Sequence, residues 1–523
     1  MPRSNSRTKN SILNLFSSIG GQLLITVFRF VVRTVFIHTL GKSYLGINGY
    51  FADILNMLSL TELGFDTAIN FKLYKPLAEN DAHRVRILLK FYKLAYRAVG
   101  VIILCMGLLL IPALPFLIKD YSRLIDIGIN PPLIFILFLL KTVSSYLFFA
   151  YRSAIMTANQ KKYILDVADY FVTVATNIAQ IAVLIIFKDF IIYTIVAVFF
   201  TILKNAVNAL IAQKYYPQFF IKEKDSLSRE EIRDLFKDCG ALFVYKVNGT
   251  VLKATDNMVL GAFVGMTMVG LYSNYLLFYT TIKNLLRQLY TAVKASTGNL
   301  FATEGVETQY RFFETMNYLT VILYGTAAVG LSVCANELLT VWIGPDYLIP
   351  APFAILIGIE TLTNGLKQNL GQIRTVTGVF RQAWKRPILS VIINLVASVI
   401  LVQYIGIYGV ILGTILADVL TNLAIDPRII HQYSFNNYKP VSAYYKKNGA
   451  YFLLLIAIGA FDLWFCSWFL SGHGWISVIV HMLIVVVTVP AVYIGIYWKT
   501  KECQYLRSIA ERTIAKLKSK VTK

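Results

Sequence analysis

The stretch ILNLFSSIGGQLLITVFRFVVRTVFIHT, residues 12–39, is largely apolar. A helix that crosses a bilayer needs about 20 such residues, so this stretch is long enough to span the membrane once. It also carries Arg29 and Arg33. Because it is too long and too charged for a cleavable signal sequence, we interpret it as the first transmembrane helix.

The composition of the whole chain agrees with membrane insertion. Of 523 residues, 57% are apolar and only 15% are charged, whereas about 25% of the residues of a soluble protein are charged. The net charge of +22 lies in short clusters between apolar runs. That arrangement is typical of loops that orient a membrane protein, and it argues against a nucleic-acid-binding surface.

The remaining apolar runs predict about fourteen spans and an all-α polytopic membrane protein. Thirteen is the alternative, because the second run is broken around Glu62–Gly64. Basic loops alternate with short, nearly neutral loops along the chain, which predicts cytoplasmic termini and an even number of spans. The spans are expected near 12–39, 46–74, 87–118, 131–158, 163–187, 190–214, 239–263, 267–300, 309–342, 352–378, 386–404, 407–432, 449–470 and 475–498.

An internal repeat divides these spans. Placing Gly41 over Gly265 aligns GKSYLGIN (41–48) with GMTMVGLY (265–272), and the same shift places Arg29 over Lys253. Many transporters consist of such repeated bundles. The predicted organisation is a six-helix lobe over 1–215, a cytoplasmic amphipathic linker over 216–238, a second six-helix lobe over 239–434, two extra helices over 435–499 and a basic cytoplasmic tail over 500–523.

The linker contains a local sequence pattern that predicts a helix. Ser228 and Glu231 have the spacing of a capping box ahead of a short amphipathic helix. We interpret this helix as lying on the inner membrane surface, with partner binding as the alternative.

Several ionisable residues fall inside predicted spans, where they are costly and usually face a cavity or one another. The predicted cationic, substrate-binding cavity consists of Arg29, Arg33, Lys253, Asp256, Lys283, Arg287 and Lys367. Such a cavity suits an anionic substrate, because arginine and lysine bind phosphate oxygens. Snorkelling to an interface is the alternative for Arg33 and Arg287, and Asp256 could serve only as an ion-pair partner of Lys253.

Other kinds of site find less support in the sequence. Glu62 and Asp66 could couple transport to a cation or proton, although their position beside Gly64 favours helix caps. The five cysteines and five histidines are dispersed, and no metal-binding spacing occurs. Because no phosphate-binding loop or nucleophile elbow occurs either, we expect neither a resident cofactor nor an enzyme.

Three sequence runs resemble a known family. LGKSYLGI (40–47), TELGFD (61–66) and DNMVLGAFVGMTMVGLYSNY (256–275) are similar to segments of bacterial polysaccharide flippases of the O-antigen and capsule type. These flippases belong to the multidrug/oligosaccharidyl-lipid/polysaccharide exporter superfamily. The resemblance covers most of the chain and is least clear over the last two spans.

The resemblance implies a flippase of the bacterial inner membrane that moves undecaprenyl-pyrophosphate-linked oligosaccharide units by alternating access between two lobes. It places Arg29, Arg33, Lys253 and Asp256 at positions where such flippases use charged residues, and it suggests sodium or proton coupling. The implied partners are the carrier lipid, membrane lipids and polysaccharide-assembly proteins, without nucleic acid.

Three alternatives remain beside this function. A flippase for the peptidoglycan lipid precursor shares the fold. A multidrug exporter of the same superfamily is disfavoured by the basic residues in the spans, since cationic drugs need acidic partners. A membrane-bound polysaccharide polymerase is disfavoured because the longest outer loop, near 119–130, is small.

Overall fold

The computed structural model describes residues 25–59, 65–148, 150–221, 223–235, 254–350, 352–470, 472, 474–508 and 511. These residues form helices and turns, and no strand occurs among them. Each of the fourteen predicted spans contains helical residues in this part of the chain. The prediction of an all-α polytopic protein is confirmed.

The chain divides into two compact units, Met1–Gly270 and Leu271–Lys523. The predicted lobe boundary at the linker 216–238 stays a prediction. The helix over residues 254–263, which follows this linker, packs within the first unit. Its Gly261 carbonyl accepts a hydrogen bond from the Lys119 amide at 3.1 Å, and a Cβ at Gly261 would overlap the Tyr50 ring.

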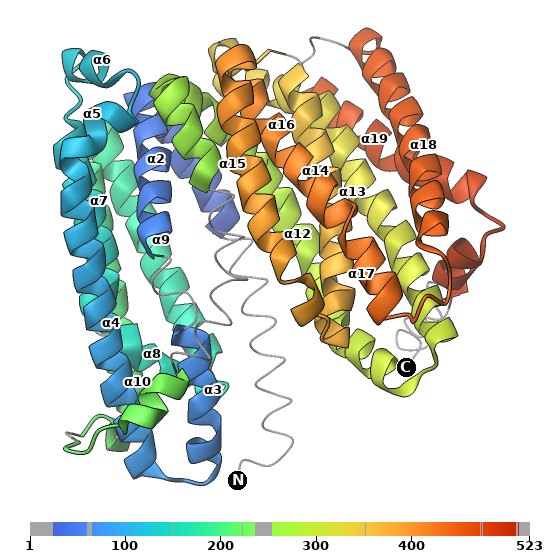
Figure 1. Cartoon of the computed structure of the whole chain (residues 1–523). Coiled ribbons are helices and arrows are strands. Elements are labelled where there is room, and N and C mark those ends of the chain that lie inside the picture. Colours follow the sequence, from blue (N-terminus) through green and yellow to red (C-terminus); the bar gives the residue numbers. More distant parts are fainter. Residues whose placement is uncertain are drawn as a thin grey trace, which may run out of the picture. The chain divides into compact units, whose positions relative to one another are not determined.

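The helices of unit 1 appear in blue to green in Figure 1. They are a helix over 25–40, α2 (Lys42–Leu58), α3 (Phe65–Ala78), α4 (Ala82–Leu110), α5 (Leu114–Leu117), α6 (Tyr121–Asp126), α7 (Pro131–Leu147), α8 (Ser153–Ala158), α9 (Lys162–Ile186), α10 (Phe190–Tyr215) and helices over 229–235 and 254–263. Helix α12 (Met266–Thr303) begins in this unit and continues into the next.

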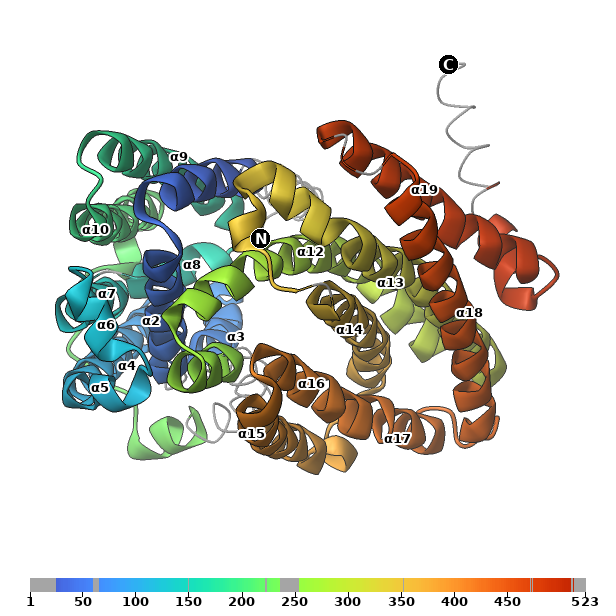
Figure 2. The same cartoon turned by 90° about the horizontal axis from the view of Figure 1, so that it is seen from above.

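The helices of unit 2 appear in yellow to red, and Figure 2 shows α13, α18 and α19 from above. They are α13 (Val306–Ile343), α14 (Pro352–Thr377), α15 (Lys385–Ile405), α16 (Ile407–Ala417), a π-helix η7 (Asp418–Leu423), α17 (Asp426–Tyr433), α18 (Val441–Trp468) and α19 (Trp475–Ile496). The extra helices α18 and α19 pack on α13, where the Tyr318 hydroxyl donates to the Tyr493 carbonyl at 3.0 Å.

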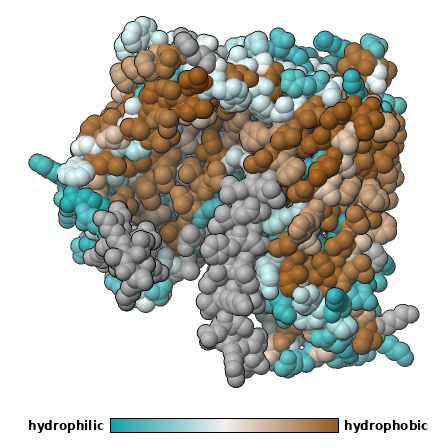
Figure 3. Space-filling view, turned by 180° about the vertical axis from the view of Figure 1, so that it is seen from behind, coloured by the Kyte–Doolittle hydropathy of each residue, from teal (hydrophilic) through white to brown (hydrophobic). Residues whose placement is uncertain are grey.

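Apolar side chains cover much of the face drawn in Figure 3, where they are coloured brown. Phe116, Leu109 and Trp468 are 88%, 77% and 74% exposed. Soluble monomers rarely present apolar patches of this extent, whereas a bilayer solvates them. Within the described residues, eight helices are long and apolar enough to cross a membrane, and α7 is a shorter apolar helix.

The internal sequence repeat is visible in the backbone of unit 1. Gly41 and Gly265 have positive φ angles of 83° and 119°, and each directly precedes a helix, α2 or α12. Glycine adopts this conformation at little cost because it has no Cβ. The hydroxyls of Ser43 and Thr267, which the repeat also aligns, lie 3.3 Å from each other.

Candidate functional site

The two predicted arginines of the first span lie one turn apart on the helix over residues 25–40. Arg29 is exposed and Arg33 is half-buried. Arg33 also interacts electrostatically with Tyr193 of α10. The two arginines therefore have different surroundings. Arg29 is accessible from outside the unit, whereas Arg33 interacts with a residue of its own unit.

The predicted residues around the second repeat are only partly described. Asp256 is buried in the helix over 254–263, beside Asn257, which donates a hydrogen bond to Asp53 of α2. Lys253 and Glu62 lie outside the described residues. Asp66 falls in α3, and its side chain is also outside the described part of the chain. The proposed pairing of Lys253 with Asp256 therefore stays a prediction.

Lys283 of α12 lies beside a buried carboxyl group. Its ammonium donates to the Tyr279 hydroxyl at 3.2 Å and attracts Glu360 of α14, which is 7% exposed. The Tyr279 hydroxyl also hydrogen-bonds with Glu360. Arg287, one turn further along α12, is exposed. The two basic residues of this helix therefore have different surroundings, and only Lys283 joins an acidic partner on α14.

Lys367 forms an ion pair that the sequence interpretation did not include. Its Nζ lies 2.9 Å from Oδ1 of Asp418, the first residue of the π-helix. The Asp418 side chain is only 5% exposed, whereas that of Lys367 is 32% exposed. The positive charge of Lys367 is therefore balanced within unit 2, and the lysine keeps partial access to its surroundings.

The π-helix places a second polar residue against the same aspartate. Asn422 donates to Asp418 Oδ1 at 2.6 Å and accepts a hydrogen bond from Arg386 of α15. A π-helical turn carries an extra residue and often occurs at functional sites. Here it turns Asp418 and Asn422 toward α14 and α15, whose basic residues they bind.

A buried aspartate continues this arrangement at the start of α17. Asp426 is 1% exposed and lies 2.6 Å from Arg374 Nη1 and 3.0 Å from Arg386 Nε. We call Lys367, Arg374, Arg386, Asp418 and Asp426 the π-helix ion cluster. Its three basic and two acidic groups join α14, α15, η7 and α17. Buried charges are tolerated only when they are paired in this way.

Glu360 adjoins the ion cluster through electrostatic interactions with Lys367 and Asp418. Among the described residues, its Oε2 has no hydrogen-bond partner. Chemically, the cluster could let a basic group exchange a carboxylate partner for a substrate phosphate, since both offer anionic oxygens.

The sequence prediction omitted Asp418, Asp426 and Arg386, because each of them lies on a different helix from its ion-pair partners. The available signal was opposite charge in neighbouring spans: Arg386 begins the predicted span 386–404, and both aspartates lie within 407–432. Charges inside adjacent spans commonly pair with each other.

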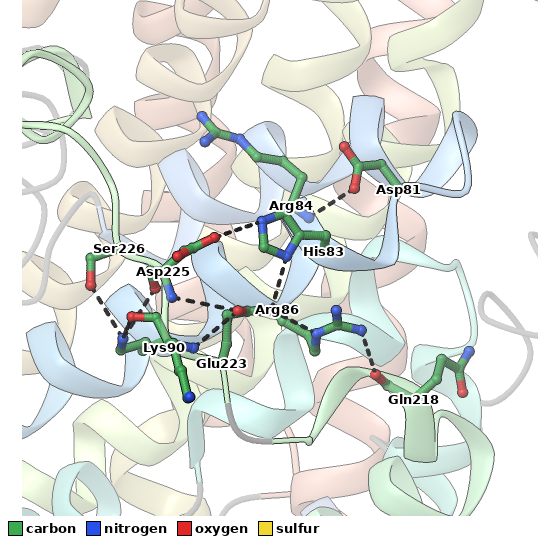
Figure 4. A network of polar contacts seen from close by, with 10 residues as sticks. Asp81, His83, Arg84, Arg86, Lys90, Gln218, Glu223, Asp225 and Ser226 are labelled. Atoms are coloured by element: carbon green, nitrogen blue, oxygen red, sulfur yellow. Dashed lines mark hydrogen bonds and ion pairs between the residues drawn. The ribbon is translucent and has the colours of Figure 1, made fainter.

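A second polar network fixes the linker to the start of α4 (Figure 4). The predicted capping box is confirmed: the Ser228 amide donates to Glu231 at 2.8 Å, and the Glu231 amide donates to Ser228 Oγ at 3.2 Å. Arg84 forms an ion pair with Glu231. Arg86 Nε donates to Glu223 at 2.9 Å. We call this network, with His83, Lys90 and Asp225, the linker clasp.

The linker clasp brings three possible metal ligands together, since ligand atoms of His83, Glu223 and Asp225 lie within 4.8 Å of one another. Their neighbours disfavour a cation. The hydrogen bond from Arg86 lowers the pKa of Glu223 to about 2, helped by the backbone amides of Asp225 and Lys224. The Asp225 carboxylate lies 3.1 Å from His83 Nε2, and the other ring nitrogen of His83 lies 3.0 Å from Glu223. Because Arg86 and His83 already contact these carboxylates, we interpret the cluster as structural.

Comparison with known proteins supports the fold alone. No family model matches the chain, and no curated protein sequence matches it. A solved structure of the lipid II flippase MurJ, in an inward closed conformation, is 16% identical with a TM-score of 0.63. That match covers 94% of this chain and 99% of the flippase.

Two structures of a multidrug resistance MATE family transporter of the MOP superfamily match less of the chain. The inward-facing conformation is 13% identical with a TM-score of 0.57, and it covers 79% of this chain and 96% of the transporter. The outward-facing conformation is 14% identical with a TM-score of 0.52, covering 82% of this chain and 96% of the transporter. The chain therefore has the fold of these transporters, and about fourteen transmembrane helices are consistent with that fold. The division into two six-helix lobes and two additional helices stays a prediction.

Proposed function

We propose that this protein is a flippase for undecaprenyl-pyrophosphate-linked oligosaccharide units in the bacterial inner membrane, with both termini in the cytoplasm. It would serve the biosynthesis of a cell-surface polysaccharide, such as lipopolysaccharide or capsule, by alternating access and without enzymatic activity. The observation that carries the proposal is the set of basic side chains within spans of a flippase-like fold, above all Lys283 and Lys367 beside Glu360 and Asp418.

The charge of these side chains favours an anionic cargo. Lys367 is one-third exposed, while its partner Asp418 is buried. A pyrophosphate could therefore approach the lysine from its open side and compete with the aspartate, because charge-assisted hydrogen bonds to phosphate and to carboxylate are of similar strength. Arg29 supplies a further exposed cation on the first span.

An apolar groove in unit 2 supports a lipid-linked cargo. It has a volume of about 710 Å³ and is lined by α13, α14, η7 and α18, including Ile359, Leu362 and Leu455. Ile359 and Leu362 flank Glu360 in the sequence of α14, so the groove and the ion cluster share a helix. The isoprenoid tail of a carrier lipid has the chemistry to fill such a groove.

Coupling to a sodium or proton gradient is part of the proposal. The sequence candidates are Glu62 and Asp66. Glu360 adds a buried carboxyl group whose neighbours include Lys283 and Lys367. A carboxyl group in this setting could gain or lose a cation as the surrounding ion pairs rearrange.

The alternatives differ in their cargo. A peptidoglycan-precursor flippase is favoured by the fit to the lipid II flippase over 94% of this chain. A multidrug exporter is favoured by the MATE matches, which cover 79% and 82% of the chain. Against the exporter stand the ion pairs of the cluster, because the carboxylates that a cationic drug would need are already bound to protein cations.

The experiment that separates these functions is a conditional deletion in the host, followed by mass spectrometry of its polyprenyl lipids. Our proposal predicts that a lipid-linked oligosaccharide accumulates and that surface polysaccharide is lost. Accumulation of the peptidoglycan precursor with cell lysis would assign the other flippase function. Unchanged lipids with greater drug sensitivity would assign the exporter function.

A further inference from the structure

Unit 1 contains a polar cavity that the residues discussed so far do not use. It has a volume of about 550 Å³ and lies among α2, α4, α7, α8, α9 and α10. Ligand pockets in proteins commonly measure about 300–1,000 Å³, so one sugar with a phosphate group is of suitable size. The described residues that line the cavity include Lys141 and Lys204 but no aspartate or glutamate.

The cavity wall is unusually polar for the interior of a membrane bundle. Hydroxyl and amide side chains recur on α9 at the spacing of one helix face, and α10 contributes a similar face. These residues are Thr173, Thr176, Asn177 and Gln180 on α9, and Thr194, Thr201 and Asn205 on α10. Such groups are expensive among lipid tails unless they bind one another or a ligand. Asn205 is 8% exposed, and its Nδ2 has no hydrogen-bond partner among the described residues.

Both lysines lie deep along their helices. Lys141 is about 15 Å from Pro131 and Lys204 about 21 Å from Phe190, at 1.5 Å per residue. These depths place the two side chains within the apolar thickness of a bilayer of about 30 Å. Lys141 and Lys204 also repel each other electrostatically.

The acidic partners available to these lysines are few. Asp169 of α9 lies 3.8 Å from Lys204 and accepts a hydrogen bond from Asn208 at 2.8 Å, so its charge is shared. Lys141 has no ion-pair partner in the described part of the chain, and its Nζ lies 5.9 Å from the centre of the Phe138 ring. The Lys141 ammonium is therefore available to bind an anion in the cavity.

We infer that this cavity is a binding site for a phosphorylated saccharide group, in which Lys141 and Lys204 bind the phosphate while the amides and hydroxyls of α9 and α10 bind the sugar. The hydroxyls of Thr176, Thr194 and Thr201 donate to backbone carbonyls of their own helices but can still accept hydrogen bonds from a sugar. The Asn205 amide has a donor without a partner among the described residues, and a neutral sugar alone would leave the Lys141 ammonium without an anion. The inference rests on the proposed function only for the source of the group, which is the headgroup of the lipid-linked cargo.

The test is binding of glucose 1-phosphate to the purified full-length protein in detergent, measured by isothermal titration calorimetry with glucose and inorganic phosphate as separate ligands. We expect saturable binding of glucose 1-phosphate that is at least about tenfold tighter than that of either part. Lys141→Gln and Lys204→Gln should each weaken it about tenfold or more, because each removes a charge-assisted hydrogen bond. Lys214→Gln, on the exposed side of α10, is the matched control and should bind normally.

A second variant tests the cavity itself without removing a charge. Ala197 lines the cavity, so Ala197→Phe should fill part of it and abolish binding while the unfolding temperature stays near the wild-type value. Binding that persists in Ala197→Phe, or that Lys214→Gln weakens as much as Lys141→Gln does, would overturn the assignment. Absence of glucose 1-phosphate binding to the wild-type protein would overturn it as well.

The source of the phosphate group and the transport function are tested separately. In nanodiscs, phosphatidylglycerol and a lipid-linked oligosaccharide would each compete with glucose 1-phosphate for the site. If phosphatidylglycerol displaces glucose 1-phosphate with the same potency as the lipid-linked oligosaccharide, the site binds membrane phospholipid and the saccharide inference is contradicted. Normal flipping by a protein that does not bind glucose 1-phosphate would refute this site alone. Specific binding without any flipping would refute the proposed function alone.

Discussion

Gly46 of α2 and Gly270 of α12, which occupy equivalent positions in the internal repeat, meet backbone to backbone. A Cβ on Gly46 would lie 3.1 Å from the Gly270 nitrogen, and a Cβ on Gly270 would lie 3.2 Å from the Gly46 nitrogen. The Cβ on Gly46 would also overlap the carbonyl oxygen of Met266, and the Cβ on Gly270 would overlap that of Lys42. Lys42 and Met266 are a second pair of positions that the repeat aligns. This reciprocity is the local two-fold relation that a repeated bundle produces.

This contact predicts a stability effect that depends on position within α2. Gly46→Ala and Gly270→Ala should each lower the free energy of unfolding by about 1–3 kcal/mol, because the added methyl group meets backbone atoms that cannot move aside. Denaturant unfolding of the purified protein in detergent measures the change. Gly49→Ala is the control on the same helix, since nothing lies within 4 Å of its Cβ position. Equal effects at Gly46 and Gly49 would contradict the close contact.

The buried Asp426 should be the most sensitive member of the ion cluster. Asp426→Asn leaves Arg374 and Arg386 without their carboxylate and should cost about 3–5 kcal/mol of unfolding free energy. The exposed Glu304→Gln should be neutral. Replacing Asp426, Arg374 and Arg386 together by leucine or methionine should recover most of the loss, because no uncompensated charge remains. A triple variant as unstable as Asp426→Asn would contradict the ion-pair explanation.

The Lys367–Asp418 pair separates stability from transport. Lys367→Met should lower transport of the lipid-linked cargo roughly tenfold, because a charge-assisted contact to phosphate is lost. The exchanged variant, Lys367→Asp with Asp418→Lys, should restore the unfolding temperature while transport stays low, since the ammonium has moved to the π-helix. Full recovery of transport in the exchanged variant would show that the pair is only structural.

The linker clasp predicts a specific pH dependence. Hydrogen bonding from Arg86 lowers the pKa of Glu223 from 4.5 to about 2. Because the folded-state pKa lies below the ordinary value, the stabilisation is complete above pH 4.5 and is lost as the pH falls toward 2. Amide hydrogen exchange of residues 223–235 should therefore remain protected at pH 3.5.

The variant Arg86→Gln checks the origin of this protection. It should release the linker near pH 4.5, whereas Arg123→Gln, an exposed arginine outside the clasp, should behave like the wild-type protein. Identical pH profiles for Arg86→Gln and the wild-type protein would refute the role of this hydrogen bond.

Much of the fold could be predicted from the sequence because its signals are local. A span is recognised from about 20 neighbouring residues, and the repeat appeared through Gly41, Gly46 and their counterparts at 265 and 270. The capping box of Ser228 and Glu231 is another local pattern. Each of these features requires only the sequence spacing of the residues involved.

The partners of charged residues were harder to predict, because they lie on different helices. Lys367 and Asp418 are far apart in the sequence, and only the packing of α14 against the π-helix brings them together. Lys141 and Lys204 were not among the residues that the sequence singled out. Their shared cavity depends on how α7, α9 and α10 pack, which hydropathy does not report.

Transport of an anionic lipid-linked saccharide can be measured after reconstitution. Purified protein in liposomes would be given a fluorescent undecaprenyl-pyrophosphate-linked oligosaccharide, and quenching from outside would report its leaflet. We expect protein-dependent translocation that falls at least about tenfold in Arg29→Ala and Lys283→Ala but not in Lys214→Gln. Translocation of a cationic dye with none of the lipid-linked saccharide, or wild-type rates in both alanine variants at equal protein abundance, would contradict it.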